Sequence, residues 1–150
     1  MGYDFAAYKR EWNKRNPGRS KELRRDWKLN NPASYLFYKS RTRAQRAGLE
    51  YSLTKEWIIQ ELAKGGCAAT GLPFSFDMGT PKQPNPWSPS IDRRDSSKGY
   101  TPDNCRIVVW VFNCAKMGWD DEVVLRMAQG LIGETDSGKS IQGVSDNLGS

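Results

Sequence analysis

One stretch of the sequence, residues 89–116, gathers polar side chains that could do chemistry. Asp92 ends a short extended segment, Asn104 closes a stretch dense in turn-forming residues, and Asn113 follows a β-branched run. Carboxylate and amide oxygens are hard ligands that suit Mg²⁺ or Mn²⁺, and a side-chain amide can also bridge the backbone groups of a loop. The stretch therefore has the side chains for either a metal site or a tightly held turn.

The elements that must position these side chains can be predicted from local pattern. Turn formers between two extended runs predict a hairpin with strands at 90–92 and 107–109. A helix over 110–117 follows the second strand, and Gly118 ends it. We expect Asn113, one turn into this helix, to face back over the hairpin.

The whole stretch resembles the core of the HNH, or ββα-metal, endonucleases, in the form common in phage proteins. The resemblance rests on the string Ser-Ile-Asp-Arg…Lys-Gly-Tyr-Thr-Pro-Asp-Asn and extends upstream to residues 67–74. It implies that Asp92 and Asn113 hold one Mg²⁺ or Mn²⁺ ion and that Asn104 is a structural residue of the motif. It also implies a small ββα core, and with the elements predicted around it we expect an α+β fold, in which this core has flanking helices and a basic N-terminal helical arm.

Arg93 stands where the family has its general-base histidine, and the sequence contains no histidine at all. A guanidinium stays protonated and cannot take a proton from water, but it can clamp a phosphate with two hydrogen bonds. The candidate catalytic residues are therefore Asp92, Arg93 and Asn113.

Two hypotheses follow. One is a DNA endonuclease or nicking enzyme, with a structure-selective variant, whose water is activated by the metal or by Asp95. The other is an inactive scaffold that binds DNA or a host protein without cleavage.

Each candidate residue also has a purely structural interpretation. Asp92 can pair with Arg94 or Arg106 as a carboxylate at a strand end, and Asn113 can bond to a loop carbonyl. The family string as a whole favours the metal-site interpretation over these two.

Basic residues are concentrated in the N-terminal third of the chain. Residues 1–50 hold 13 Lys and Arg against 5 Asp and Glu, a net charge of +8, whereas residues 51–150 have a net charge of −2. Such a distribution indicates a surface that binds a polyanion, and we expect the partner to be DNA. The candidate DNA-binding residues are Arg10, Lys14, Arg15, Arg19, Arg24, Arg25, Lys28, Arg41, Arg43, Arg46, Arg94, Lys98 and Lys116.

The arm, predicted at residues 1–48, repeats one pattern: an acidic residue and Trp, followed by Asn-Pro, occur around Trp12 and again fifteen residues later around Trp27. Proline disfavours helix at the preceding residue, which predicts three short helices. These helices lie at 4–15, 19–30 and 33–47. The two tryptophans either pack on the core or belong to a DNA-binding clamp, and the basic charge favours the clamp.

The core is predicted at residues 49–132 and a disordered tail at 133–150, because the tail is polar and rich in Gly and Ser. Aromatic residues after the second strand are assigned to the core. The remaining predictions are a strand at 49–53, a helix at 55–64, an irregular loop at 77–88, a closing helix from Asp120 to Leu131 that packs on the core, and core positions for Trp110, Phe112 and Trp119.

The three cysteines include no Cys-x-x-Cys pair, so neither a disulfide framework nor zinc is expected. The sequence also has no apolar run long enough to cross a membrane, and its first ten residues lack the apolar segment of a signal peptide. We therefore expect a cytoplasmic protein, within a bacterial host if the phage resemblance holds. The oligomeric state is left open, a dimer included.

Overall fold

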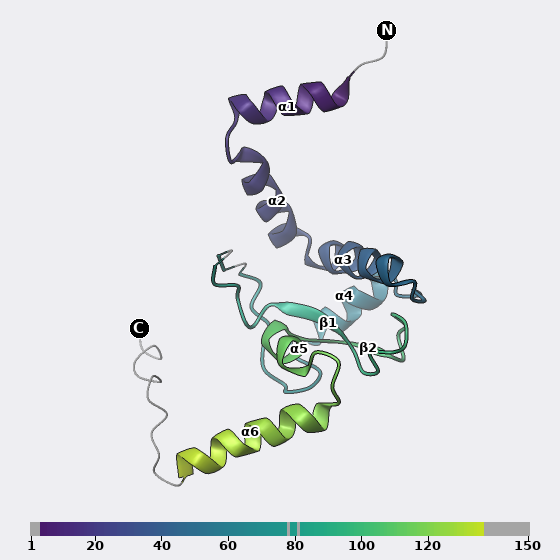
Figure 1. The fold of residues 1–150 in the computed structure, drawn as a ribbon, viewed down its shortest axis with the longest axis vertical. Helices are drawn as coiled ribbons and strands as arrows, with labels where there is room; N and C mark the ends of the chain where they lie inside the picture. The colour runs from purple at the N-terminus through teal and green to yellow at the C-terminus, as the bar shows by residue number, and fades with distance from the viewer. Residues whose placement is uncertain (1–3, 78, 81, 137–150) are drawn as a thin grey trace.

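The computed structural model of the chain describes residues 4–77, 79–80 and 82–136. The described residues form four helices, then a β-hairpin with a helix directly after it, and then a last helix (Figure 1). Helices with a small antiparallel sheet confirm the α+β class. The elements are α1 (Phe5–Arg15), α2 (Arg19–Asn30), α3 (Pro32–Ala47), α4 (Lys55–Ala63), β1 (Pro89–Arg93), β2 (Cys105–Val109), α5 (Trp110–Lys116) and α6 (Asp121–Asp136).

The two strands pair in the antiparallel sense, with Asp92 opposite Arg106 and Ile91 opposite Ile107. All of β2 is buried, as suits a run of β-branched residues. The predicted strands are confirmed, and each is longer by two residues than the pattern indicated. We call β1, β2 and α5 together the hairpin–helix unit.

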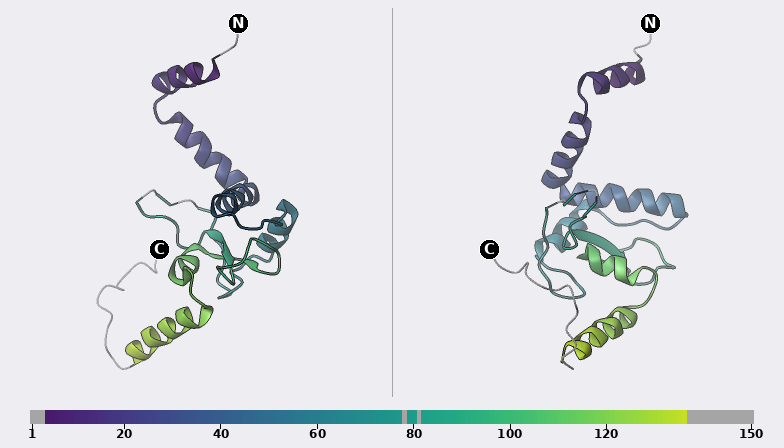
Figure 2. Two further views of the ribbon diagram at one scale, coloured as in Figure 1. Left: turned by 45° about the vertical axis from the view of Figure 1, so that its right-hand side comes forward. Right: turned by 60° about the vertical axis from the view of Figure 1, so that its left-hand side comes forward.

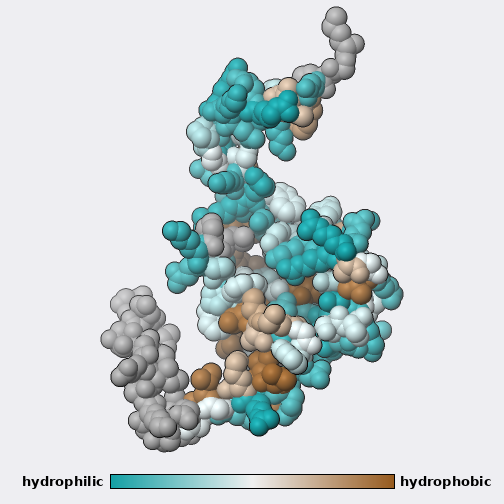
Figure 3. All heavy atoms as spheres, in the orientation of Figure 1, coloured by the Kyte–Doolittle hydropathy of each residue, from teal (hydrophilic) through white to brown (hydrophobic). Residues whose placement is uncertain are grey.

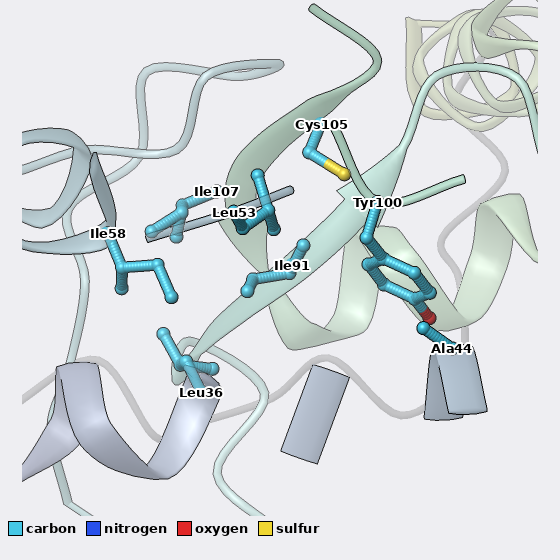
Figure 4. Close-up of a cluster of buried hydrophobic side chains, with 8 residues drawn as sticks. All are labelled: Leu36, Ala44, Leu53, Ile58, Ile91, Tyr100, Cys105 and Ile107. Carbon is cyan, nitrogen blue, oxygen red and sulfur yellow. The ribbon is translucent and has the colours of Figure 1, made fainter. Parts of the chain in front are cut away.

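The core lies between the hairpin and helices α3 and α4. Leu36 of α3, Ile58 of α4 and Ile91 and Ile107 of the hairpin converge in one cluster (Figure 4). Full burial of such a side chain stabilises a fold by about 1.5–3 kcal/mol. These contacts hold α3 on the hairpin, so α3 belongs to the core, although the sequence analysis placed it in the arm of residues 1–48.

The first four helices begin and end close to the predicted positions. Pro32 opens α3, where its missing N–H costs nothing, and the Thr54 hydroxyl caps α4 by accepting from the Trp57 N–H at 3.1 Å. The predicted helices at 4–15, 19–30, 33–47 and 55–64 each agree with the structure to within one residue at either end.

Helices α1 and α2 extend away from the core and bury no residue (Figures 1 and 2). Trp27 is 44% exposed, and its ring lies 6.5 Å from that of Tyr38, which is itself on the surface of α3. Trp12 is half-buried on α1. Neither tryptophan is buried in the core: Trp27 reaches only the Tyr38 ring of α3, and α1 and α2 form an arm that meets the core where α2 joins α3.

Helix α6 differs from the prediction in both length and packing. It continues to Asp136, so the first four residues of the predicted tail are helical, while residues 137–150 lie outside the described part of the chain. Its apolar side chains are exposed, among them Met127 and Leu131 (Figure 3). The prediction that α6 closes the core is wrong. No helix among the described residues is long and apolar enough to cross a membrane.

The three aromatic residues assigned to the core have different surroundings. Phe112 packs against a second buried cluster of Cys67, Val108 and Val109, and Trp110 is half-buried. Trp119 is 63% exposed, so its assignment to the core is wrong. It follows the end of α5, where the chain turns outward toward α6.

The predicted strand at 49–53 is reduced to one parallel bridge between Tyr51 and Tyr100. Two backbone bonds flank it: the Tyr100 N–H donates to the Glu50 carbonyl at 2.8 Å, and the Ser52 N–H donates to the Tyr100 carbonyl at 2.9 Å. The chain comes so close here that a Cβ atom on Gly99 would lie 2.5 Å from the Glu50 carbonyl oxygen. Position 99 therefore has room only for glycine.

We predict that Gly99→Ala lowers the free energy of unfolding by about 1–3 kcal/mol, the usual cost of overpacking, because the Glu50 backbone cannot move aside easily. Gly118→Ala is the matched control, since its Cβ would meet the Ser96 hydroxyl at an ordinary 3.5 Å. Chemical denaturation of both variants measures the difference. Equal stabilities would contradict the close approach.

Candidate functional site

Asn104 holds the loop that joins the two strands. Its amide nitrogen donates to the carbonyls of Asp95 at 3.0 Å and Gly99 at 2.9 Å, and its amide oxygen accepts from the Asp95 N–H at 3.0 Å. The Arg94 N–H also donates to the Asn104 carbonyl at 2.7 Å. One buried side chain thus bridges three backbone groups of the loop.

Asp92 lies inside the hairpin–helix unit with only 2% of its surface exposed. The hairpin register places Arg106 opposite it, and Arg106 Nε donates to Asp92 Oδ2 at 2.9 Å. Of the two pairings considered from the sequence, the structure has Arg106. The other edge of that guanidinium binds Asp121 at the start of α6, with Nη1 2.7 Å from Oδ2.

These ion pairs shift the pKa values of the partners. Arg106 lowers the pKa of the Asp121 carboxyl. Burial alone would lower the pKa of Arg106, but its hydrogen bonds to Asp121 and Asp92 outweigh burial and raise it. The arginine thus stays charged between two carboxylates.

Lys116, at the last position of α5, is buried to 1% exposure beside Asp92. Its Nζ lies 3.3 Å from Asp92 Oδ1 and donates to the carbonyls of Arg93 at 2.9 Å and Arg94 at 3.3 Å. The sequence analysis placed Lys116 among surface contacts to DNA phosphates. This prediction is wrong, because the ammonium group points into the protein.

Asn113 faces back over the hairpin, but it contacts a different part of β1 from Lys116. Its amide nitrogen donates to the Ser90 hydroxyl at 2.8 Å and to the Ile91 carbonyl at 3.0 Å. The side chain therefore fixes α5 against β1, while Asp92 has Arg106 and Lys116 as its partners.

Arg93 is the last residue of β1, and Asp95 lies in the loop that joins the two strands. Arg93 Nη1 donates to the Lys98 carbonyl at 2.7 Å, and its guanidinium lies 4.9 Å from the centre of the Tyr100 ring. Hydrogen bonds from Ser97 and, after them, the nearby Lys98 lower the pKa of Asp95 to about 2. A carboxylate with so low a pKa is a poor general base at neutral pH.

The remaining basic candidates lie on the surface. Exposed side chains are those of Arg10, Lys14, Arg15, Arg19, Arg24, Arg25, Arg41, Arg43, Arg46, Arg94 and Lys98, and Lys28 is half-buried. A groove of about 640 Å³ runs along α2, where Lys21, Arg24, Arg25 and Lys28 outnumber the single Glu22. Its opposite wall comes from the loop before β1, with Gly79, Thr80 and Pro84.

With this geometry established, the chain can be compared with known proteins. No family model matches the sequence, and no curated protein matches it either. A solved structure described as the rare-cutting HNH restriction endonuclease PacI is similar, with a TM-score of 0.51 and 19% sequence identity over 71% of this chain and 80% of that chain. The fold of this chain is therefore HNH-like.

The family resemblance in the sequence implied a divalent metal ion held by Asp92 and Asn113, and the residues around Asp92 do not fit one. Both carboxylate oxygens already face cations, Arg106 on one side and Lys116 on the other. A further two positive charges would have no compensating ligand in this buried place. Among the described residues, no three His, Cys, Asp or Glu side chains gather into a group that could hold a metal, and Cys67, Cys105 and Cys114 are free thiols.

Sequence reasoning raised the pairing of Asp92 with Arg106 as an alternative, but it missed that Lys116 and Asp121 complete the cluster. The available signal was the hairpin register, which places Arg106 across from Asp92 once the strands are aligned. The three-residue spacing from Asn113 to Lys116 was a second signal, because it sets both side chains on one face of a helix.

We predict that Asn104→Ala lowers the free energy of unfolding by about 2–4 kcal/mol, since each lost hydrogen bond contributes about 1 kcal/mol and buried loop groups lose their partner. Asp103→Ala, at the exposed neighbouring position, is the matched control. Urea denaturation compares the two. If Asn104→Ala were as stable as the control, the loop would not depend on the Asn104 side chain.

A second prediction concerns Asp95, whose folded-state pKa of about 2 is depressed from 3.8. A depressed carboxyl stabilises the fold above its unfolded pKa and loses this contribution as the pH falls from about 4 through about 2. Ser97→Ala removes the largest cause and should raise the Asp95 pKa toward 3.8, as NMR titration of the carboxyl carbon can measure. An unchanged titration in that variant would exclude the Ser97 hydroxyl as the cause, because the Ser97 backbone N–H bond remains.

Proposed function

We propose that this protein binds DNA through its basic arm and the adjoining surface of its HNH-like core. The observation that carries the proposal is the row of cations along α2. Lys21, Arg24, Arg25 and Lys28 follow the spacing of one helix face and line the groove beside the core. A groove with four cations and one carboxylate complements a phosphate backbone.

Position and charge on the rest of the arm agree with this proposal. The exposed arginines of α1 and α2 take no part in contacts with the core. Exposed arginines also occur in the C-terminal half of α3, at Arg41, Arg43 and Arg46. Figure 3 shows that most of the visible surface of the arm is hydrophilic. The acidic part of the chain lies elsewhere, after residue 50.

Binding without cleavage is the function that the hairpin–helix unit favours. Arg93 cannot accept a proton, and its guanidinium is tied to the Lys98 carbonyl. Asp95 is a weak base, and the charge of Asp92 is already balanced by Arg106 and Lys116. These residues suit a rigid binding surface better than they suit activation of a water molecule.

A second candidate function is a DNA endonuclease or nicking enzyme dependent on Mg²⁺ or Mn²⁺, including one selective for branched DNA. The likeness of the fold to an HNH restriction endonuclease is the observation that favours it. Incubation with supercoiled plasmid and with a four-way junction, in Mg²⁺ or Mn²⁺, separates the two candidates. We expect retarded mobility without nicking. Nicking that Asp92→Asn abolishes would establish the enzyme instead.

We predict that the double substitution Arg24→Gln and Arg25→Gln weakens DNA binding and flattens its dependence on salt. Each lost phosphate contact lowers the slope of log K against log salt concentration by about 0.9, so the pair should lower it by about 2. Fluorescence anisotropy with a labelled duplex over a salt series measures both effects.

The matched control removes the same charge elsewhere, by Lys64→Gln after α4 together with Arg126→Gln on α6, both at exposed positions that do not line the α2 groove. This pair should leave the slope nearly unchanged. If the control flattened the slope as much as the arm variant, net charge rather than the α2 groove would account for binding.

A further inference from the structure

We infer that the ammonium group of Lys116 is the resident cation of the hairpin–helix unit and that the unit folds without a divalent ion. The inference concerns the folded chain alone and does not depend on DNA binding. It starts from the three oxygen atoms around Lys116 Nζ, which are Asp92 Oδ1 and the carbonyl oxygens of Arg93 and Arg94, at 2.9 to 3.3 Å.

This arrangement is the kind of environment that a hard cation takes in proteins. Carboxylate and backbone carbonyl oxygens are typical ligands of Mg²⁺ and Ca²⁺. Lys116 presents three N–H donors to these oxygens from a side chain with 1% exposure. Among the described residues, no buried side-chain nitrogen or oxygen is left without a partner. The ammonium group and the Asp92 carboxylate therefore both have their partners within this cluster.

The charges of the cluster also balance without another ion. Lys116 and Arg106 supply two positive charges, and Asp92 and Asp121 supply two negative ones. Adding a divalent cation beside Asp92 would bring it against two cations in a buried environment, where such repulsion is screened least. Lys116 would have to leave before a metal ion entered.

The helix itself delivers Lys116 to this place. Asn113 fixes α5 to β1 by donating to the Ser90 hydroxyl and the Ile91 carbonyl. One turn later, the same helix face reaches the end of β1, where the chain turns at Arg93 and Arg94. The amide that the family resemblance assigned to a metal thus serves as the anchor that positions the ammonium.

The first test uses the unmodified protein. Its melting temperature should be the same in EDTA and in 1 mM Mn²⁺, and electron paramagnetic resonance should show all added Mn²⁺ as free aqueous ion. Stabilisation by Mn²⁺ that disappears in Asp92→Asn would overturn the inference. Loss of DNA binding has no bearing on this measurement, so failure of the proposed function and failure of this inference are distinguishable.

The second test removes the ammonium. Lys116→Met keeps most of the apolar stem and should melt several degrees lower, because Asp92 and two carbonyls lose a buried partner. Lys116→Ala should in addition gain stabilisation by Mn²⁺, since the vacated oxygen cradle can accept the ion. Lys98→Ala, on an exposed lysine of the loop between the strands, is the control and should melt close to the parent protein, because its surface ion pair with Asp95 contributes little.

Results for Lys116→Met decide the matter even where Lys116→Ala fails to fold. A Lys116→Met protein that melts with the parent would show that the core does not depend on the ammonium, and the inference would fall. A lowered melting temperature, together with a parent protein indifferent to Mn²⁺, is the expected pair of results.

Discussion

The buried charge of Asp92 is the constraint on which the hairpin–helix unit depends. A carboxylate removed from water destabilises a fold by several kcal/mol unless cations and hydrogen-bond donors replace the lost solvation. Here Arg106 comes from the paired strand and Lys116 from the following helix, so strand register and helix position must both be correct for Asp92 to be compensated. The buried charge of Asp92 is therefore compensated only when β2 and α5 are packed in this arrangement.

The same constraint reaches the elements outside the unit. Arg106 extends from Asp92 to Asp121 and so joins the hairpin to the first turn of α6, a helix whose apolar side chains are otherwise largely exposed. On the opposite side, Leu36 and Ile58 attach α3 and α4 through apolar contacts. The core is thus held by hydrophobic packing on one side of the hairpin and by ion pairs on the other.

Much of this fold could be predicted from local pattern. The run Ile107-Val108-Val109, the Thr54 cap and the Asn-Pro boundaries each act over a few residues, and the corresponding elements are present. The loop around Asn104 was also accessible, because turn-forming residues and one amide at its end indicate a side chain that bridges backbone groups.

The contacts of the candidate site could not be predicted in the same way. The partners of Asp92 lie 14 and 24 positions away in the sequence, and only the assembled hairpin brings them together. Lysine is almost never fully buried unless it is paired, so its residue type alone placed Lys116 on the surface. The prediction for Trp119 is wrong for the opposite reason. Aromatic residues are usually packed in the core, but this one follows Gly118 after the end of α5 and is exposed.

The bend between α1 and α2 determines how much of a ligand the arm can follow. Gly18 adopts φ +86°, a conformation that suits glycine, and it separates helices of eleven and twelve residues. At 1.5 Å per residue these helices are about 16 and 18 Å long, so each spans roughly half of a duplex turn of about 34 Å. A straight rod of the same composition would touch one strand tangentially, whereas a bent pair can stay close to a backbone that curves around the duplex axis. Under the proposed function, the turn that contains Gly18 would set the curvature of the arm's contact with a duplex, and the helix lengths would set its extent.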